Sequence, residues 1–343
     1  MEKVKIALVG CGNVGQVIHL PILKRMPDVE LVAVCDPDER KAKTIAARYG
    51  IPTSFKSVEA MLASPIGSEV EAVDICSSTD AHKATSIAAL QAGKDVLVEK
   101  PIARTAKEAQ EIVNVANEYK CKLMVGMNSR FRPDTMILKS FIENGELGKI
   151  FYIKSGWLRQ QSSQAAWAQQ REKSGGGVFL DLGIVMLDMA LWLLNYPDVL
   201  SVSGTAYHQY TKKVEDSSAV FIRLANNVTL TIESSWTFHR EGDFFYNNVF
   251  GNEGSAFINP LRVFKNVAGN LVNLTPAKSE SPVGLYKKSY ENEIRHFVNS
   301  VKGVVPVISS GAEAVQRMRV VDAYYQSVAK GKEIILKPSG KKK

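Results

Sequence analysis

Short apolar runs alternate with amphipathic segments through the first third of the chain. Val4–Val9 is a mostly apolar run of strand length, whereas Ala109, Ile112 and Val113 recur at helical spacing within the segment 106–120. Apolar strands separated by amphipathic helices are typical of a parallel sheet covered on both faces. The pattern predicts an α/β fold with a doubly wound parallel sheet over residues 1–127, whose strands are expected at 4–9, 31–35, 52–55, 72–76, 95–99 and 122–127.

The pattern changes after residue 128. Strand-like runs joined by turn signals such as Asn226-Asn227 replace the regular alternation, and an apolar helix at 181–194 follows the glycine run 175–177. We expect a second, α+β domain over residues 128–343, built on a large, mostly antiparallel or mixed open sheet. Its expected strands include 149–157, 200–207, 218–224, 228–236 and 244–250, and its other expected helices are 134–144, 290–301 and 312–329.

A glycine-rich turn joins the first expected strand to the first expected helix, at 14–26. Residues 10–15 have the G-x-G-x-x-G spacing of a Rossmann dinucleotide-binding fingerprint. The first glycine permits the turn, the second lets the backbone approach a pyrophosphate, and the third lets helix and strand pack closely. The pyrophosphate would lie on amide groups at the positive end of the helix. The predicted cofactor-binding residues here are Gly10, Gly12, Asn13, Val14 and Gly15.

An acidic residue favours NAD over NADP as that cofactor. Asp36 stands 21 positions after Gly15, at the end of the second expected strand. A carboxylate there accepts hydrogen bonds from the adenosine ribose hydroxyls and repels a 2′-phosphate. Arg40 is near enough in sequence to reach a phosphate or to lie against the adenine, so NADP stays the less favoured alternative.

Two serines and a histidine follow the fourth expected strand. Ser77 and Ser78 come directly after it, and His82 stands at the start of the next helix. The hydroxyl groups either contact the cofactor or cap that helix. His82 is a candidate cofactor contact, although an isolated histidine at a helix start is more often structural.

The run Glu99-Lys100-Pro101 closes the fifth expected strand. The residue before a proline is pushed toward extended backbone, so Lys100 should stand at the carboxyl end of the strand. In an open parallel sheet that edge is where ligands bind. A lysine held beside a nicotinamide is a natural proton donor or acceptor for hydride chemistry, so Lys100 is the predicted catalytic residue and Glu99 a predicted cofactor contact.

Composition argues against several function classes. The chain is 45% apolar and 23% charged, as in ordinary globular proteins, and neither a membrane-crossing run nor a signal peptide is expected. We therefore expect a cytoplasmic protein without a membrane partner. The net charge of +8 is dispersed, with part of it in a disordered tail expected at Lys341–Lys343, so no nucleic-acid partner is expected. No C-x-x-C pair is present, so a metal site is not expected, and the cysteines fit small buried hydrophobic residues: Cys11, Cys35, Cys76 and Cys121.

Motifs along nearly the whole chain resemble the glucose–fructose oxidoreductase and inositol dehydrogenase (Gfo/Idh/MocA) family. The resemblance implies a Rossmann domain plus an α/β domain whose open sheet serves oligomerisation, as a homodimer or homotetramer. It also implies NAD(P)-dependent oxidation or reduction at a carbinol or carbonyl carbon, usually of a sugar, cyclitol or sugar nucleotide. The segments that carry it are 10–15, 77–82, 92–101, 128–133, 145–148, 175–188 and 310–313, of which Glu99-Lys100-Pro101 is the most specific.

The resemblance assigns further roles and exposes one departure. It implies that Lys100 contacts the nicotinamide ribose and a substrate oxygen, with Glu99 near the cofactor. The family pattern then has an aspartate followed four residues later by a histidine on the same helix face. Here the aspartate is Asp181, expected to orient Lys100 or hold a substrate hydroxyl, but the histidine position is Val185. Valine cannot move a proton.

Three interpretations of this departure stay open. Lys100 handles the proton alone or with a water; or another group supplies it, with Tyr207, His208, His239 or a substrate hydroxyl as candidates. In the third interpretation the chain is a non-catalytic NAD-binding sensor or regulatory protein. Loss of one general acid or base costs about 10²–10⁴-fold in rate, so an active enzyme is favoured.

Four more residues are candidates for substrate contact. Asn128 and Arg130 follow the last strand of the first domain, where they would contact nicotinamide or substrate, or form hydrogen bonds at the domain junction. Trp167 offers a flat face that suits a sugar ring, although tryptophan is more often packing. Val185 would add an apolar patch beside the reacting carbon.

Overall fold

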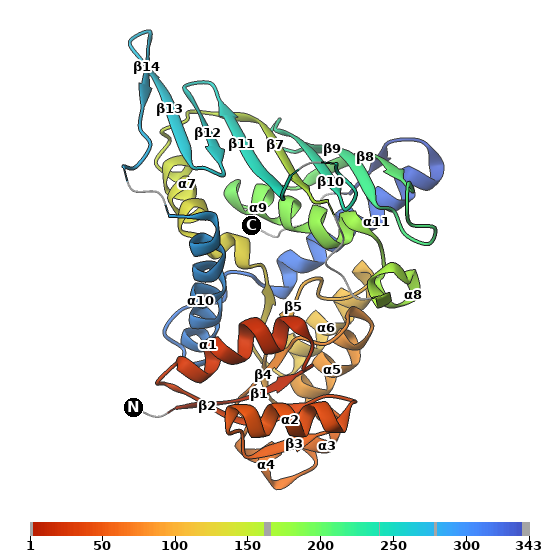
Figure 1. The fold of residues 1–343 in the computed structure, drawn as a ribbon. Coiled ribbons are helices and arrows are strands. Elements are labelled where there is room, and N and C mark those ends of the chain that lie inside the picture. The colour runs from red at the N-terminus through yellow and green to blue at the C-terminus, as the bar shows by residue number, and fades with distance from the viewer. Residues whose placement is uncertain (1–2, 161–165, 240, 278–279, 338–343) are drawn as a thin grey trace. The chain divides into compact units, whose positions relative to one another are not determined.

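The structure, a computed structural model, describes residues 3–160, 166–239, 241–277 and 280–337 (Figure 1). Contacts divide the chain into two compact units. The first unit comprises Met1–Asn128 and Tyr290–Val315, and the second comprises Ser129–Ser289 and Gln316–Lys343. Lys341–Lys343, expected to form a disordered tail, lie outside the described residues.

A parallel sheet forms the centre of the first unit. Its six strands, counted over the described residues, run in the order β3-β2-β1-β4-β5-β6, and every pairing is parallel. The strand order reverses between β1 and β4, and ligands bind at such a switch point, outside the carboxyl ends of the strands. The expected doubly wound sheet is confirmed. Its strands are β1 Val4–Val9, β2 Val29–Cys35, β3 Thr53–Phe55, β4 Ala72–Ile75, β5 Asp95–Glu99 and β6 Leu123–Gly126.

Amphipathic helices cover this sheet. Helix α6 (Ala106–Glu118) begins where Thr105 accepts the backbone N–H of Glu108, and it buries the predicted apolar face. The helix expected at 14–26 is split into a π-helical turn, η1 (Gly15–His19), followed by α1 (Leu20–Arg25). The other helices are α2 Glu39–Tyr49, α3 Val58–Leu62, α4 Pro65–Glu69 and α5 Thr79–Gln91.

A distant segment completes the first unit. Helix α10 runs over Pro282–Val301, and Arg295 from its second half donates to Asp28 at 2.8 Å. Lys302 binds the other oxygen of Asp28 at 2.5 Å. Beyond it, the carbonyl of Ser309 accepts the backbone N–H of Val125 at 2.8 Å. The segment 290–315 therefore belongs to the Rossmann unit although it lies far along the sequence.

The second unit is built on a mixed sheet. Its nine strands, counted over the described residues, have the order β14-β13-β12-β11-β7-β10-β9-β8-β15; only β7 and β10 pair in parallel. The expected mixed, mostly antiparallel sheet is confirmed. The strands are β7 Ile150–Leu158, β8 Val199–Tyr207, β9 Ser217–Leu224, β10 Thr229–Ser235, β11 Phe244–Gly251, β12 Gly254–Ile258, β13 Arg262–Val267, β14 Asn270–Asn273 and β15 Ile334–Ile335.

Helices lie on one face of this sheet (Figure 1). Apart from Asp188, helix α9 (Ile184–Leu193) is apolar on every side, and almost all of its side chains are buried. The segment Arg171–Leu193 is long and apolar enough to cross a membrane, so the expectation of no such run was wrong; 89% of its most apolar window is buried in the fold, as in a core helix. The remaining helices are η2 Asn128–Phe131, α7 Pro133–Glu143, η3 Ala166–Gln169, α8 Arg171–Ser174, η4 Phe179–Gly183 and α11 Gly311–Lys330.

Candidate functional site

The glycine-rich turn has the geometry that its spacing predicts. Gly10 has φ +96°, and a Cβ there would lie 2.5 Å from the backbone nitrogen of Ser77. A Cβ on Gly15 would collide with the carbonyl oxygen of Gly10. A Cβ on Gly12, in contrast, would come no closer than 4.0 Å to the carbonyl oxygen of Cys76, and the residue is exposed. The turn therefore leaves its backbone open at the position where a pyrophosphate approaches.

Asp36 lies beside that turn and is only 5% exposed. Its Oδ2 accepts the backbone N–H of Cys11 at 2.8 Å, and its Oδ1 accepts that of Asp38 at 3.0 Å. The Lys41 ammonium lies 3.0 Å from the same Oδ1. The carboxylate thus joins the end of β2 to the glycine turn, while Arg40 is exposed at the start of α2.

The segment after β4 offers a polar group to a ligand. His82 contacts the carbonyl oxygens of Pro101 at 2.8 Å and Ser77 at 2.9 Å, and burial lowers the pKa of its imidazole. His82 therefore lies between the segments that follow β4 and β5, and its neutral ring donates to one of these two carbonyls. Ser78 Oγ donates to Asp80 at 2.6 Å instead of capping α5. The buried Ser77 Oγ has no hydrogen-bond partner among the described residues.

These features fit NAD. The open backbone at Gly12 suits a pyrophosphate, the carboxylate of Asp36 suits ribose hydroxyls, and the unpartnered hydroxyl of Ser77 leaves one group for a cofactor atom.

Lys100 stands directly after β5, at the carboxyl edge of the sheet, and is half-buried. The peptide bond between Lys100 and Pro101 is cis. Glu99 Oε2 accepts the backbone N–H of Lys100 at 3.0 Å, and Glu99 Oε1 lies 3.1 Å from His19 Nε2. Burial alone would raise the pKa of Glu99, but the hydrogen bond and charge of His19 hold it below its usual value. The Glu99 carboxylate is therefore ionised and fixed on both oxygens.

The other predicted catalytic residue belongs to the second unit. Asp181 lies in the π-helical turn η4, and its Oδ2 accepts the indole N–H of Trp236 at 3.0 Å. Val185 lies one turn later in α9 and is 3% exposed. π-helical turns occur frequently at functional sites, and both η1 and η4 coincide with predicted site segments.

A buried carboxylate anchors the start of η4. Glu215 accepts the backbone N–H of Gly177 and that of Phe179, each at 3.1 Å. The Tyr325 hydroxyl donates to Glu215 at 2.9 Å. Burial raises the pKa of Glu215, although these three donors oppose the rise. Glu215 thereby fixes the turn that carries Asp181.

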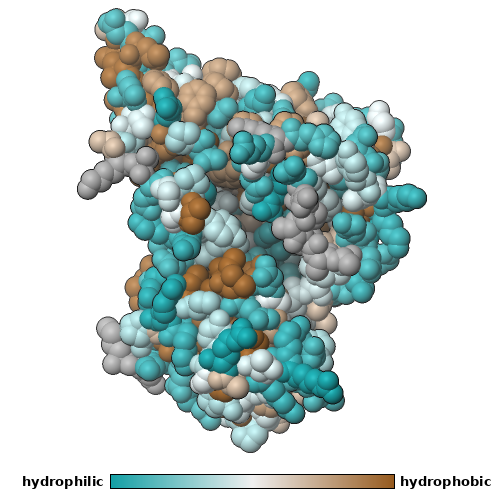
Figure 2. All heavy atoms as spheres, viewed as in Figure 1, coloured by the Kyte–Doolittle hydropathy of each residue, from teal (hydrophilic) through white to brown (hydrophobic). Residues whose placement is uncertain are grey.

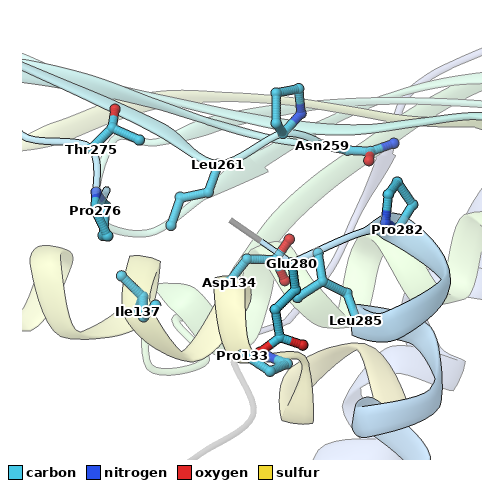
Figure 3. Close-up of a pocket in the computed structure, with 11 residues that line it drawn as sticks. Pro133, Asp134, Ile137, Asn259, Leu261, Thr275, Pro276, Glu280, Pro282 and Leu285 are labelled. Carbon is cyan, nitrogen blue, oxygen red and sulfur yellow. The ribbon is translucent and has the colours of Figure 1, made fainter. Parts of the chain in front are cut away.

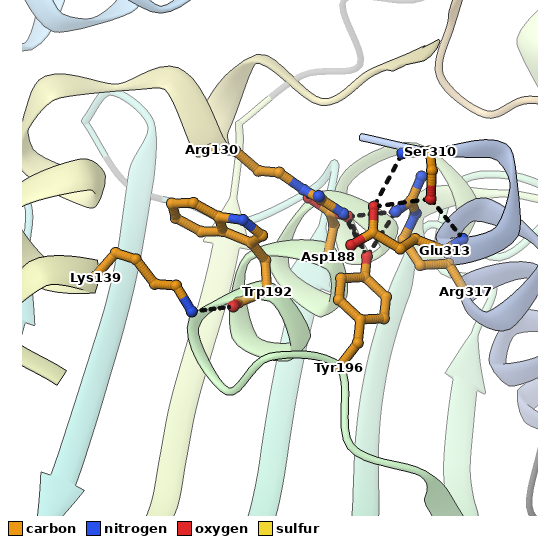
Figure 4. Close-up of polar contacts among 8 residues, drawn as sticks. All are labelled: Arg130, Lys139, Asp188, Trp192, Tyr196, Ser310, Glu313 and Arg317. Carbon is orange, nitrogen blue, oxygen red and sulfur yellow. Dashed lines mark hydrogen bonds and ion pairs between the residues drawn. The ribbon is translucent and has the colours of Figure 1, made fainter. Parts of the chain in front are cut away.

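Arg130 serves the interior of the second unit. Its guanidinium is fully buried and donates to both oxygens of Asp188, at 2.8 and 2.7 Å, and to the Tyr196 hydroxyl at 2.7 Å (Figure 4). Arg317 donates to the same Asp188 carboxylate at 2.6 Å. Burial alone would raise the pKa of Asp188, but the two guanidinium groups hold it below its usual range. Asn128 begins η2, the turn that also contains Arg130.

The remaining candidates lie in other parts of the second unit. Trp167 is half-buried in η3. Tyr207 ends β8 and is exposed, as is His208 after it. The exposed His239 lies 3.2 Å from the Tyr210 hydroxyl through its Nε2.

A small cavity of about 110 Å³ lies elsewhere in the second unit (Figure 3). Its polar groups already have partners: Asp134 binds Arg132 at 2.7 Å, and the Asn259 amide donates to the Phe245 carbonyl at 3.0 Å. None of the predicted site residues lines it. Its lining includes Pro133, Ile137, Pro260, Leu261, Thr275, Pro276, Pro282 and Leu285.

Sequence reasoning did not single out three residues that contact the predicted site. His19 contacts Glu99, Trp236 contacts Asp181, and Glu215 anchors η4. Each is a single polar or aromatic residue in a segment whose apolar pattern is otherwise ordinary. No spacing within the sequence pairs them with the residues that they contact.

Comparisons with known proteins find relatives along nearly the whole chain. D-glucoside 3-dehydrogenase of Escherichia coli is 28% identical to this chain over 353 residues, covering 98% of each. Inositol 2-dehydrogenase of Rhizobium meliloti is 29% identical over 340 residues, covering 96% of this chain and 98% of its own. The solved structure of levoglucosan dehydrogenase with NADH and L-sorbose superposes with a TM-score of 0.88 at 22% identity, over 98% of this chain and all of that one, which shows the same fold.

Two family models match consecutive parts of the chain. An oxidoreductase family with an NAD-binding Rossmann fold matches residues 4–127, and the C-terminal alpha/beta domain of the same family matches residues 139–336. The expected enzyme class, an NAD-dependent dehydrogenase or reductase, and the expected NAD cofactor are thereby confirmed. The chain belongs to the Gfo/Idh/MocA family of oxidoreductases.

Proposed function

We propose that this protein transfers a hydride between NAD and a carbinol or carbonyl carbon of a sugar, cyclitol or sugar-nucleotide-like molecule. The observation that carries the proposal is the position of Lys100, at the carboxyl end of β5 in a NAD-binding sheet. Relatives over nearly the full length are named as glucoside and inositol dehydrogenases. In this proposal residues 1–127 bind the cofactor and residues 128–343 bind substrate and form the oligomer.

The proposed chemistry assigns the proton to Lys100. NAD, when bound, accepts or supplies the hydride. The Lys100 amine takes the proton of the substrate hydroxyl during oxidation, or protonates the alkoxide during reduction, and as an ammonium it stabilises the oxyanion. Asp181 orients Lys100 or holds a neighbouring substrate hydroxyl, and the Trp236 indole N–H fixes its carboxylate.

Because Val185 has no group that can carry a proton, the proposal gives proton transfer to Lys100. A buried valine cannot exchange a proton, so no second acid or base stands one helical turn after Asp181. We propose that Val185 contributes an apolar contact beside the reacting carbon, which suits a deoxy or acylated substrate. A bound substrate with a polar group against Val185 would contradict this assignment.

Substitution of Lys100 tests the proposal. In Lys100→Ala, NADH affinity measured by nicotinamide fluorescence should stay within about threefold of wild type, because the glycine turn and Asp36 are untouched. Turnover of a sugar or cyclitol substrate, followed at the NADH absorbance, should fall by at least about 10³-fold, near the upper end of the range for loss of a general acid or base. Lys107→Ala, on α6, is the matched control. A Lys100→Ala enzyme within tenfold of wild-type kcat would contradict the role of Lys100.

The valine at position 185 also supports one alternative, a non-catalytic NAD-binding regulator. This alternative predicts tight NADH binding, no turnover of any sugar or cyclitol by the wild-type protein, and a protein partner whose binding depends on NAD. Turnover that disappears in Lys100→Ala would contradict it.

A further inference from the structure

A buried cluster of titratable side chains adjoins the Glu99–Lys100 turn in the first unit. His19 ends η1, Asp74 lies on β4, and Glu99 ends β5. His19 Nδ1 lies 2.8 Å from Asp74 Oδ2, and His19 Nε2 lies 3.1 Å from Glu99 Oε1. Ionised carboxylates only accept hydrogen bonds, so both ring nitrogens must donate and the ring must carry two protons. His19 is thus a positive charge between two negative ones.

The groups around the ring agree with that charge state. Burial alone would lower the pKa of His19, but the charge and hydrogen bond of Asp74 raise it well above its usual value. Glu293 from α10 is fully buried, and neither of its carboxyl oxygens has a hydrogen-bond partner among the described residues. Burial, followed by repulsion from Glu99, raises the pKa of Glu293 well above its usual value. Cys76 Sγ donates to Asp74 Oδ1 at 3.7 Å.

These contacts are hydrogen bonds, not the ligands of a shared metal ion. His19, Asp74 and Cys76 place ligand-type atoms within 4.8 Å of one another, which would also suit a metal. Two ligand atoms bound to one tetrahedral ion at about 2.0 Å stand about 3.3 Å apart. The 2.8 Å separation between His19 Nδ1 and Asp74 Oδ2 is shorter and fits a direct charge-assisted hydrogen bond.

A continuous set of hydrogen bonds leads from this ring to the catalytic lysine. His19 holds Glu99 Oε1, and Glu99 Oε2 accepts the backbone N–H of Lys100. Asp74 holds the opposite side of the ring. Rotation of the Glu99 carboxylate would therefore break a hydrogen bond at each of its oxygens.

We infer that His19 is a positioning residue: it aims the Glu99 carboxylate at the Lys100 amide and so fixes the turn that presents Lys100 at the sheet edge. The inference rests on the proposed role of Lys100. Without the ring, the Glu99 carboxylate loses one of its two anchors and rotates, and the Lys100 turn moves with it. A displacement of about 1 Å in a reacting group can cost about 10²-fold in rate.

The test combines kinetics of His19→Gln with a measurement that needs no substrate. In His19→Gln, kcat should fall by about 10–100-fold while NADH affinity and substrate KM stay within about threefold, because no ligand contact is removed. Circular dichroism and the thermal midpoint verify that the variant is folded. His296→Gln, a substitution on α10 outside the cluster, should leave kcat unchanged. In histidine-labelled wild-type protein, ¹⁵N NMR at pH 8 should show one doubly protonated ring that is missing from His19→Gln.

Each contrary outcome is distinct from failure of the proposed function. Any one of three results would overturn the inference. The first is a neutral His19 ring at pH 8, and the second is a folded His19→Gln enzyme with kcat within twofold of wild type. The third is a stoichiometric metal ion that is lost on substitution of His19. If the wild-type protein turns over no substrate, the proposed function fails. The inference about His19 is then tested by the rate at which a reagent acylates Lys100, measured by mass spectrometry in wild type and in His19→Gln. An unchanged rate in His19→Gln overturns it, and a change of at least about threefold supports it.

Discussion

At the scale of single residues, Asp36 links cofactor choice to the shape of the glycine turn. Its carboxylate accepts the Cys11 amide and neutralises Lys41. Removing it takes away the group expected to accept the ribose hydroxyls and leaves Lys41 without its counter-charge. A 2′-phosphate would then meet a cation instead of a carboxylate.

We predict that Asp36→Ser shifts the ratio of NADPH to NADH affinity toward NADPH by at least about tenfold, or about 1.4 kcal/mol. Fluorescence titration with each cofactor measures both dissociation constants. Asp38→Ser is the control, since Asp38 caps α2 through the backbone N–H of Lys41 and serine is also a good cap. An unchanged ratio in Asp36→Ser would show that this carboxylate does not choose the cofactor.

A second residue-scale prediction concerns Asp188. Asp188→Asn should lower the free energy of unfolding by about 3–5 kcal/mol, because it leaves Arg130 and Arg317 buried beside a neutral group. The pKa of Asp188 is lower in the folded state than in the unfolded state, so its stabilisation is present above the unfolded pKa of about 3.9 and is lost as pH falls through the folded value.

Urea unfolding at pH 7, and at a series of acidic pH values, measures both parts of that prediction. The difference in unfolding free energy between wild type and Asp188→Asn should be largest at pH 7 and become smaller only at acidic pH. Asp243→Asn, which removes half of an exposed ion pair with Arg159, should cost less than about 1 kcal/mol. A similar loss of unfolding free energy in both variants would contradict a special role for the buried Asp188 carboxylate.

Site residues that belong to a local sequence motif could be predicted from the sequence. Residues whose role depends on a partner far away in the sequence could not. The glycine spacing and the position of Lys100 after β5 follow directly from local pattern. Arg130 is a predicted candidate for substrate contact or for hydrogen bonds at the domain junction, and its guanidinium binds Asp188, which is 58 positions away. A partner so distant in sequence leaves no local pattern.

At the scale of elements, the strands and helices lie close to their expected places, but the two π-helical turns were not expected. Both η1 and η4 continue directly into an α-helix, so the apolar pattern is unbroken and indicates one continuous helix. His19 lies in the first of these turns and Asp181 in the second. Contacts such as those of Glu215 at the start of η4 come from distant parts of the sequence, and the periodicity of the segment does not show them.

The anchor of η4 provides an element-scale prediction. Glu215→Gln replaces a carboxylate that accepts two amide N–H groups and the Tyr325 hydroxyl with an amide that presents its own donors. We expect the free energy of unfolding to fall by about 1–3 kcal/mol. Amide hydrogen exchange at residues 177–182 should be at least about tenfold faster than in wild type. Exchange measured by mass spectrometry should be unchanged in α6, in the first unit. Equal acceleration in both regions would mean a general loss of stability instead of a local anchor.

At the scale of the whole molecule, the sheet of the second unit carries a row of half-exposed aromatic rings. Tyr152 on β7 stacks on Phe250 of β11 at 5.6 Å, Phe250 meets Phe257 of β12 at 5.9 Å, and Phe257 meets Phe264 of β13 at 6.2 Å. Figure 2 also shows apolar side chains gathered where β13 and β14 lie. Leu271 on β14 is exposed. An apolar stripe of this kind on a sheet face is typical of an interface between protein chains.

We therefore predict that the wild-type protein is a homodimer or homotetramer, and that Phe257→Lys with Phe264→Lys lowers its mass to that of a smaller species. Light scattering after size-exclusion chromatography measures the mass directly. The control is Lys154→Gln, a polar change on β7. A wild-type monomer, or an unchanged oligomer in the double variant, would contradict the interface.

The alternation of elements predicts the two architectures, because each depends on local periodicity. The return of residues 290–315 to the first unit was not apparent, since it depends on contacts such as Asp28 with Arg295, which are 267 positions apart. The cytoplasmic location stays a prediction.

The most direct test of the central claim is mass spectrometry of a mixture of sugars, cyclitols and sugar nucleotides incubated with the protein and NAD. We predict that one compound loses two hydrogens, that NADH forms in equal amount, and that neither change occurs with Lys100→Ala. An unchanged mixture despite measured NAD binding, or the same product from Lys100→Ala, would contradict it.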